Sequence, residues 1–279
     1  MNLTRRSLLA ATAAAWPASA MARAEGDLSL SGRWVQGGFI LGRTAPGAAV
    51  LVDGTPMTAA SDHGLFVVGL DRDAPASTEI EVRSGVATTR RTVQVAAGTF
   101  PSTRVNGLPP STIAPSNPAL LARIQREAAL KTTAFASRDP GDAFASGFIW
   151  PLETYRISSA WGAQRVLNGT PARPHYGIDL AAPRGTAIRA PAAGLVVLAE
   201  PDLHFEGGLT LIDHGQGLVS AYLHQSALDV REGDRVRQGQ PIGRVGSTGR
   251  ATGPHLCWRM KWRNRNLDPS LMVGNLFSA

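Results

Sequence analysis

Short apolar runs separated by turn dipeptides dominate the first third of the chain. Four runs recur at the roughly ten-residue spacing typical of small all-β domains, at residues 38–41, 49–52, 65–68 and 79–82. Between them stand dipeptides that accept the positive φ of tight turns, Asp53-Gly54, His63-Gly64 and Ser84-Gly85. A further run, 91–95, alternates with a period of two. Residues 27–98 are therefore predicted to form a small β-sandwich-like domain.

The N-terminus has the organisation of an export signal. Arg5 and Arg6 precede a short apolar run that ends in small residues near Ala20. A membrane anchor is the weaker alternative, because the run contains Pro17 and is shorter than the roughly 20 residues that span a bilayer. Residues 1–24 are expected to be a signal peptide, with paired arginines typical of the twin-arginine route. This predicts an exported protein, periplasmic or envelope-associated, without a transmembrane anchor after signal removal.

The chain is moderately basic, with a formal net charge of +7 over 279 residues. Such a charge suits an anionic envelope polymer or a membrane surface. The sequence has no dense run of Lys and Arg with interleaved aromatic residues, so nucleic acid is not an expected partner. The single cysteine, Cys257, excludes an intramolecular disulfide, and stability must come from packed cores.

The composition changes after Gly98. Several prolines between residues 101 and 115 favour an extended linker over a regular sheet. Asn117-Pro118 then provides an N-cap and a first-turn proline, which predicts a helix near 118–135. Its apolar residues Leu121, Ile124 and Ala128 fall on one face. We assign residues 99–145 to a Pro-rich linker with this helix.

The remaining part, residues 146–279, returns to apolar runs joined by glycine turns. Residues 195–198, 209–212 and 218–222 are examples, and no segment of this part has a helical period. We predict a compact, mostly antiparallel β domain. The fold class expected for the whole chain is therefore mainly β.

Potential metal ligands are concentrated in this last domain. Alternate side chains of a strand share a face, so His175 and Asp179 can converge on one ion, as can His255 and Cys257. Gly177 adds no bulk between the first pair. Imidazole, carboxylate and thiolate are all ligands of tetrahedral zinc. Each pair alone is a weak pattern, equally compatible with a buried histidine beside an apolar thiol.

The motifs around these residues follow a characteristic order. They are His175-Tyr-Gly-Ile-Asp179, Ala221-Tyr-Leu-His224, Gly233 to Gly243, Gly246-Ser-Thr-Gly249 and Gly253-Pro-His255-Leu. In type, order and spacing they resemble the lysostaphin-type (LytM-like) zinc metallopeptidases, which cut peptide bridges in bacterial peptidoglycan. The resemblance covers most of residues 146–279 and implies a LytM-like peptidase domain there.

The resemblance also implies roles for individual residues. His175 and Asp179 match two ligands of one zinc ion, and His224 and His255 match the two histidines that orient water and stabilise the oxyanion. Where the family has its third ligand, a histidine, this chain has Cys257. Cysteine preserves metal binding, but a thiolate donates more charge than an imidazole and makes zinc a weaker Lewis acid. Whether the Cys-ligated site is active is therefore left open.

The sequence is compatible with three functions. The leading hypothesis is a zinc metalloendopeptidase that hydrolyses peptide cross-links of peptidoglycan in the cell envelope, with peptide stems as substrate. The first alternative is a catalytically weak or inactive regulator that activates a cell-wall amidase or contacts a cell-division protein. The second is a wall-binding module that holds peptide without cutting it. Four matching site positions and one conservative replacement favour the enzyme.

Other candidate residues are weaker. His63 lies in a turn dipeptide, His214 precedes a glycine turn, and both are expected to be structural. His204 has no supporting partner in the sequence. Relatives sometimes cover the active cleft with an upstream segment that places an asparagine on the metal. Asn106 and Asn117 lie in the right region for this, and the sequence favours neither.

Overall fold

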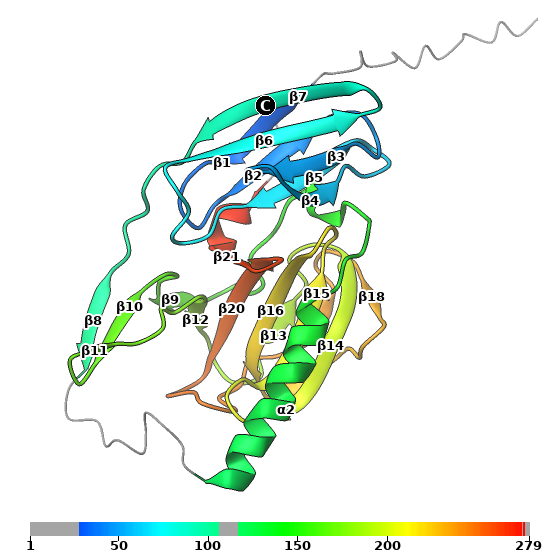
Figure 1. The fold of residues 1–279 in the computed structure, drawn as a ribbon. Coiled ribbons are helices and arrows are strands. Elements are labelled where there is room, and N and C mark those ends of the chain that lie inside the picture. Colours follow the sequence, from blue (N-terminus) through cyan, green and yellow to red (C-terminus); the bar gives the residue numbers. More distant parts are fainter. Residues whose placement is uncertain (1–27, 106–116, 275, 277–279) are drawn as a thin grey trace, which may run out of the picture.

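A computed structural model describes residues 28–105, 117–274 and 276. The expected signal peptide and Asn106 lie outside these residues. The fold is mainly β, with antiparallel sheets at both ends of the chain and one α-helix between them, as Figure 1 shows. The predicted fold class is confirmed. No helix within the described ranges has the length and apolar character that crossing a bilayer requires.

The N-terminal part consists of two antiparallel sheets. One has the order β1-β2-β5 and comprises Ser29–Arg33, Phe39–Arg43 and Leu65–Gly69. The other has the order β4-β3-β6-β7 and comprises Thr55–Ala59, Ala49–Val52, Ser77–Ser84 and Ala87–Gln94. Phe39, Phe66 and Ile80 are buried in the core of this part. The turn at Asp53-Gly54 has φ values of 49° and 75°, as its residue types predict.

The Pro-rich stretch contains a strand that the sequence did not predict. Strand β8 (Ser102–Val105) pairs in parallel with β10 (Gln164–Leu167), and β11 (Thr170–Pro171) adds to the same small sheet. The expectation that prolines exclude sheet pairing here was wrong. Strand β8 falls between the prolines, and Pro101 still contributes its carbonyl, which accepts a hydrogen bond of 2.8 Å from the Gln164 amide.

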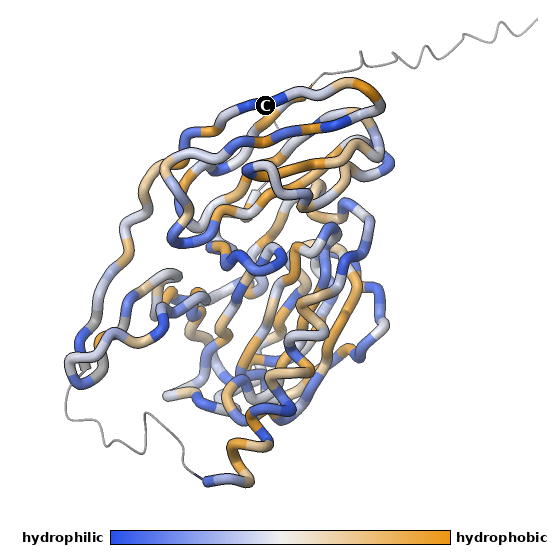
Figure 2. Tube along the Cα trace, in the orientation of Figure 1, coloured by the Kyte–Doolittle hydropathy of each residue, from blue (hydrophilic) through white to orange (hydrophobic). Residues whose placement is uncertain are grey.

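The C-terminal part is built on one large antiparallel sheet with the order β18-β14-β15-β16-β20-β12-β9. These strands are Arg235–Val236, Gly194–Leu203, Gly207–Asp213, Leu218–Gln225, His255–Trp262, Ile178–Ala181 and Arg156–Ser159, with β21 (Arg265–Leu267) paired to β20. A smaller sheet joins β13 (Ala187–Arg189), β19 (Pro241–Arg244) and β17 (Ala227–Leu228). Two short 3-10 helices, Ala143–Ser146 and Pro269–Met272, complete it. Strand β14 is largely orange in Figure 2, whereas β21 is largely blue.

The two faces of this sheet are covered differently. On one face Tyr222, Trp258 and Trp262 lie in the main hydrophobic core. On the other face Leu211, Ala221, Leu223 and Cys257 form a second apolar cluster with Ala134 of helix α2 (Pro118–Phe135). Alternation along β20 explains the division, because Trp258 and Cys257 must point to opposite faces. Cys257 therefore lies on the face that α2 partly covers (Figure 1).

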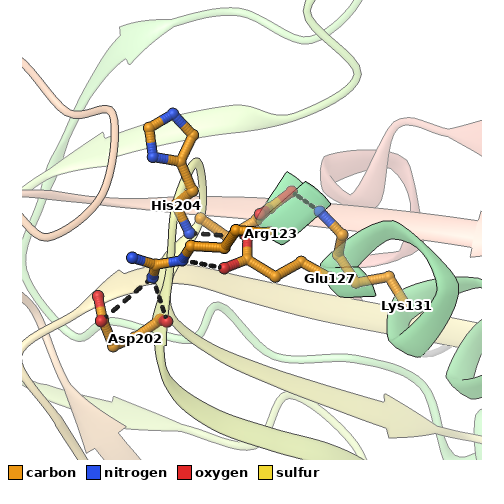
Figure 3. Close-up of polar contacts among 6 residues, drawn as sticks. Arg123, Glu127, Lys131, Asp202 and His204 are labelled. Atoms are coloured by element: carbon orange, nitrogen blue, oxygen red, sulfur yellow. Dashed lines mark hydrogen bonds and ion pairs between the residues drawn. The ribbon is translucent and has the colours of Figure 1, made fainter. Parts of the chain in front are cut away.

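Polar contacts hold α2 on the sheet, as Figure 3 shows. Glu127 is buried, pairs with Arg123 Nε at 2.6 Å and accepts a hydrogen bond of 2.9 Å from the His204 amide. Arg123 also bonds the Asp202 carbonyl at 2.8 Å, and Lys131 pairs with Glu206. These pairs add to the apolar contacts that Ala134 and Phe135 make with the second cluster.

The expected apolar face of α2 is not its docking face. Leu121 is 40% exposed and Ala128 is also exposed, whereas Glu127 and Ala134 are the buried residues of this helix. Ile124 and Ala128 instead line a groove beside the sheet. Asn117 caps the helix by accepting bonds from the Ala119 and Leu120 amides, so its side chain is committed to the cap.

The two parts of the chain are packed against each other. The Gln216 side chain donates to the Leu65 carbonyl at 2.9 Å, and Arg265 donates to the Gly69 carbonyl at 2.9 Å. His63 is exposed and its Nδ1 lies 2.9 Å from the Asp142 carboxylate. His63 therefore connects the two parts, in keeping with its expected structural role.

Candidate metal centre

Three potential ligands meet on the helix side of the large sheet. Strands β12 and β20 pair with Asp179 directly opposite Cys257, and His175 precedes β12. The donor atoms of these three residues all lie within 4.8 Å of one another. Nε2 of His175 is 3.3 Å from Asp179 Oδ1 and 3.5 Å from Cys257 Sγ. Their convergence is set by strand pairing rather than by sequence proximity.

His175 reaches this cluster from an extended segment and not from a strand. The expectation that His175 and Asp179 share one strand was wrong, because β12 begins only at Ile178. The His175 backbone is held instead by hydrogen bonds with Gly162 and Ala163, at 2.8 and 2.9 Å. Its Nδ1 lies 3.2 Å from Ser159 Oγ, which leaves Nε2 facing the other two ligands.

Gly177 allows the close approach of the two segments. A Cβ atom at this position would lie 2.7 Å from Cys257 Sγ and 2.9 Å from Arg259 Cγ. Both distances are shorter than van der Waals contact, so any side chain here would displace the thiol. The residue type at position 177 is thus required by the position of Cys257.

The donor set fits a zinc ion. Zinc–ligand lengths of about 2.0 to 2.3 Å in a tetrahedron separate the donor atoms by roughly 3.3 to 3.8 Å. The distances of 3.3 and 3.5 Å from His175 Nε2 agree with this. Asp179 Oδ1 is buried and has no hydrogen-bond partner among the described residues, which is unusual for a carboxylate oxygen. A bound cation would satisfy it.

The protonation states of the ligands depend on their surroundings. Burial raises the pKa of Asp179, but the interactions with His175 and His255 outweigh this and leave it below its ordinary value. Burial raises the pKa of the Cys257 thiol to about 12, against the opposing effect of Arg259. Without a cation the thiol keeps its proton, and metal binding would convert it to the thiolate.

Two further histidines lie beside the cluster. The rings of His224 and His255 are 4.8 Å apart between centroids, and His255 Nε2 is 3.8 Å from Asp179 Oδ1. In each ring Nδ1 lies 2.8 Å from a carbonyl, that of Thr248 for His224 and that of Gly253 for His255. A carbonyl only accepts, so both Nδ1 atoms carry hydrogen and both Nε2 atoms are free acceptors when the rings are neutral.

A bulge in β16 aims His224 at this site. The pairing of Gly208 with Gln225 and of Thr210 with Tyr222 leaves Leu223 and His224 opposite a single residue of β15. His224 has φ = 67°, a left-handed conformation that is uncommon outside glycine. Burial lowers the pKa of His224 to about 4, only partly offset by the Thr248 carbonyl. The imidazole is therefore neutral at neutral pH.

Arg259 is a site residue that the sequence did not reveal. It follows Cys257 by two positions on β20, and its Nε donates a hydrogen bond of 3.4 Å to Cys257 Sγ. Burial disfavours its charge, but Cys257 and more distant carboxylates keep the pKa of Arg259 above its ordinary value. The period of two along β20 was the pattern that could have indicated this contact.

The cluster opens into a groove of about 780 Å³. Its floor includes β20, one wall includes α2, and the other includes the segment around Arg173 and Tyr176. The lining is strongly basic. Its cations on β20 and the following turn are Arg259, Lys261 and Arg263, and those on the walls are Lys131, Arg138, Arg173 and Arg250. The acidic residues of the lining are Asp179 and Glu206.

The other candidate histidines lie elsewhere. His214 is fully buried, with Nδ1 2.7 Å from the Ala193 carbonyl and Nε2 2.7 Å from Ser220 Oγ. Burial lowers its pKa to about 4. These bonds satisfy both ring nitrogens and agree with a structural role. The ring of His204 packs against Phe205 at 4.6 Å between centroids.

Comparison with known proteins supports the assignment of the domain. Residues 173–269 match peptidase family M23. A solved structure from Pseudomonas aeruginosa, described as a candidate M23 peptidase, is 30% identical, with a TM-score of 0.67. The similarity covers 87% of this chain and 96% of that one. The chain belongs to peptidase family M23. The resemblance to lysostaphin-type metallopeptidases is thereby confirmed.

Curated M23 relatives share the peptidase region. The DD-carboxypeptidase/endopeptidase Mpg of Neisseria meningitidis is 40% identical over 121 residues, which is 43% of this chain and 28% of that protein. The peptidoglycan DD-endopeptidase ShyA of Vibrio cholerae is 37% identical over 131 residues, 46% of this chain and 30% of that protein. This chain therefore spans less than a third of the length of these M23 relatives.

Proposed function

We propose that this M23 protein is a zinc metalloendopeptidase that hydrolyses peptide cross-links of peptidoglycan in the cell envelope. The observation that carries the proposal is the convergence of His175, Asp179 and Cys257 around a buried carboxylate oxygen without a hydrogen-bond partner. M23 relatives named as peptidoglycan DD-endopeptidases support the choice of substrate. Export to the periplasm and the division into signal, sandwich, linker and peptidase parts belong to the same proposal.

In this proposal His175 Nε2, Asp179 Oδ1 and Cys257 Sγ hold one zinc ion. When bound, zinc would supply Lewis acidity toward the scissile carbonyl and activate water near neutral pH. The thiolate and the carboxylate together neutralise the charge of the ion, which weakens that acidity relative to a site with one carboxylate and two imidazoles. Hydrolysis should be slower than with a histidine at position 257.

His224 and His255 would handle protons beside the ligands. Nε2 of neutral His224 is a free acceptor, because Nδ1–H is committed to the Thr248 carbonyl. His224 Nε2 can therefore take a proton from the attacking water and pass it on to the leaving amine. His255, whose Nδ1–H is held by the Gly253 carbonyl, lies close enough to orient the water and, once protonated at Nε2, to stabilise a developing oxyanion.

The test combines metal analysis with digestion by the full-length protein. We expect one zinc per chain and release of peptide-bond cleavage products from purified peptidoglycan, identified by mass spectrometry. His224→Ala should keep the zinc and lose cleavage. His204→Ala is the matched control, because that ring contacts Phe205 and not the ligands. A protein without zinc that cleaves no peptidoglycan would refute the enzyme.

The same experiment separates the alternatives. A zinc-loaded protein that binds peptidoglycan without cutting it would be a wall-binding module. Stimulation of a purified cell-wall amidase, without cleavage by the protein alone, would instead identify a regulator.

A further inference from the structure

Beyond the ligand cluster, the groove floor continues as a row of cations. Cys257, Arg259 and Lys261 alternate along β20 and share a face, while Trp258, Met260 and Trp262 are buried on the opposite face. Arg263 follows at the turn and also lines the groove. Arg138 and Arg173 line the walls next to it. We call Arg138, Arg173, Lys261 and Arg263 the basic tract.

The basic tract forms no salt bridge among the described residues, and the nearest acidic influence is that of Asp71 on Lys261. Within the described residues, none of its members has a carboxylate oxygen within the 4.0 Å of a salt bridge. Lys261 lies instead over the Phe135 ring at 4.7 Å, and Arg173 over the Tyr176 ring at 5.4 Å. Nε of Arg263 is buried and has no hydrogen-bond partner in the described part of the chain.

Such an arrangement is costly without a ligand. Lys261 and Arg263 are half-buried and lose hydration, whereas Arg138 and Arg173 are exposed. The like charges of these four side chains also repel one another. Burial and, to a smaller extent, Arg173 lower the pKa of Lys261 against the opposing effect of Asp71, and burial and Arg138 lower the pKa of Arg263. Lys131, which is also half-buried and lines the same groove, is paired with Glu206. An anion that enters the groove would offset the lost hydration of these cations and the repulsion between them.

The position of the tract defines the shape of that anion. Lys261 follows Cys257 by four residues on one strand, which corresponds to about 13 Å at a rise of 3.3 Å per residue. An extended peptide covers the same distance with about four residues. A peptide lying along β20 would therefore reach the tract while another of its bonds lies at the ligand cluster.

We propose that the basic tract is a subsite for carboxylate groups of a peptide whose scissile bond lies at His175, Asp179 and Cys257. This rests on the proposed peptidase function and specifies its substrate as an acidic peptide arm. Planar guanidinium groups bind carboxylates through two parallel hydrogen bonds, so Arg263 would supply orientation, and Lys261 a point charge. The buried Nε of Arg263 would gain the partner that it lacks.

The test measures binding apart from cleavage. The full-length, zinc-loaded protein carrying His224→Ala would be titrated with a fluorescent tetrapeptide with two free carboxylates, and with the same peptide amidated at both. We expect the acidic peptide to bind more tightly. Lys261→Gln and Arg263→Gln should each weaken it roughly five- to tenfold, as expected for half-buried charged hydrogen bonds. The amidated peptide should be affected less than twofold.

Arg237→Gln is the matched control, since it removes one exposed positive charge outside the groove. It should leave binding of the acidic peptide within twofold of the parent. Thermal unfolding of each variant checks that the fold is kept. The comparison of acidic with amidated peptide uses the parent protein, so it tests the subsite even if a tract variant fails to fold.

Each outcome bears on one hypothesis. Equal binding of acidic and amidated peptides would overturn the subsite while leaving cleavage of peptidoglycan by the native chain unaffected. Tract variants that lose binding of dextran sulfate but not of the acidic peptide would also overturn it, in favour of a non-peptide polyanion. Acidic-peptide binding that depends on the tract, in a native chain that cuts nothing, would support the subsite and refute the peptidase.

Discussion

Arg259 donates a hydrogen bond of 3.4 Å from Nε to Sγ of Cys257, two residues earlier on the same face of β20. The guanidinium is the positive charge next to a sulfur that would become a thiolate on metal binding. An N–H···S bond withdraws charge from the sulfur and lowers the cost of burying it. In the proposed zinc site Arg259 would therefore be a positioning residue that partly offsets the weaker Lewis acidity expected of a thiolate-bound zinc.

Replacing Arg259 with glutamine should weaken zinc binding about tenfold, the lower end of the range for residues that support a metal ligand. The measurement is competition with a chelating dye. Substitution with cobalt gives a second measurement, because the sulfur-to-cobalt absorption band should move to longer wavelength when the N–H···S bond is lost. A merely structural role would leave that band in place, and Arg259→Lys should restore it partly.

Replacing Cys257 with histidine should keep zinc and abolish the sulfur-to-cobalt band. Hydrolysis should become several-fold faster, because neutral imidazole leaves the ion a stronger Lewis acid. Cys257→Ala should instead weaken zinc binding by more than the roughly 10- to 100-fold that loss of an outer partner costs. An unchanged affinity in Cys257→Ala would show that the sulfur is not a ligand.

Gly177→Ala should disturb the site through packing alone. The added Cβ would lie 2.7 Å from Cys257 Sγ, so the thiol must shift and zinc binding should fall. Overpacking of this kind costs about 1–3 kcal/mol of unfolding free energy. Gly253→Ala is the control, since no atom lies within 4 Å of a Cβ there and its φ is not in the left-handed range. Equal zinc content in both variants would contradict the prediction.

Glu127→Gln should loosen helix α2 and with it one wall of the groove. Burial raises the pKa of Glu127, but the Arg123 pair and the His204 amide outweigh burial and leave the pKa below its ordinary value. The contribution of Glu127 to stability is therefore complete above the unfolded-state pKa of about 4.3 and is lost as the pH falls through the lower folded-state value.

At neutral pH the Glu127→Gln substitution should lower the unfolding free energy by about 1–3 kcal/mol, or raise hydrogen exchange in α2 if the helix detaches locally. The difference between variant and parent should shrink below pH 4. Exposed Glu232→Gln is the control and should change neither quantity. A constant difference down to low pH would show that the charge of Glu127 is not responsible.

Local features of the chain were predictable where a residue type strongly favours one backbone conformation or one hydrogen bond to its neighbours. Positive φ at Asp53-Gly54 and the Asn117 cap both follow from short-range chemistry that the neighbouring residues complete. The grouping of His175 and Asp179 with Cys257 was also predicted, because a characteristic motif order and the ligand types pointed to it together.

Long-range consequences were not predictable. Strand β8 forms because β10, some sixty residues later, offers a partner to a segment between prolines. The docking face of α2 depends on the buried carboxylate of Glu127, which pairs with Arg123 and accepts from an amide in the turn after β14. These contacts override the apolar residues Leu121 and Ile124. His175 lies outside a strand, yet Gly162 and Ala163 bring its Nε2 to the cluster.

Apolar runs and turn dipeptides alone were enough to predict a mainly β chain, since alternation and turn chemistry are local properties. The zinc-type ligand set in its second half was predicted from donor chemistry together with the resemblance to lysostaphin-type metallopeptidases. The tertiary structure decided what surrounds those ligands. Pairing of β12 with β20 places Asp179 opposite Cys257, a bulge turns His224 toward His255, and β20 carries its cations into the groove. These relationships arise from strand register and from the packing of α2, which join residues far apart in the chain.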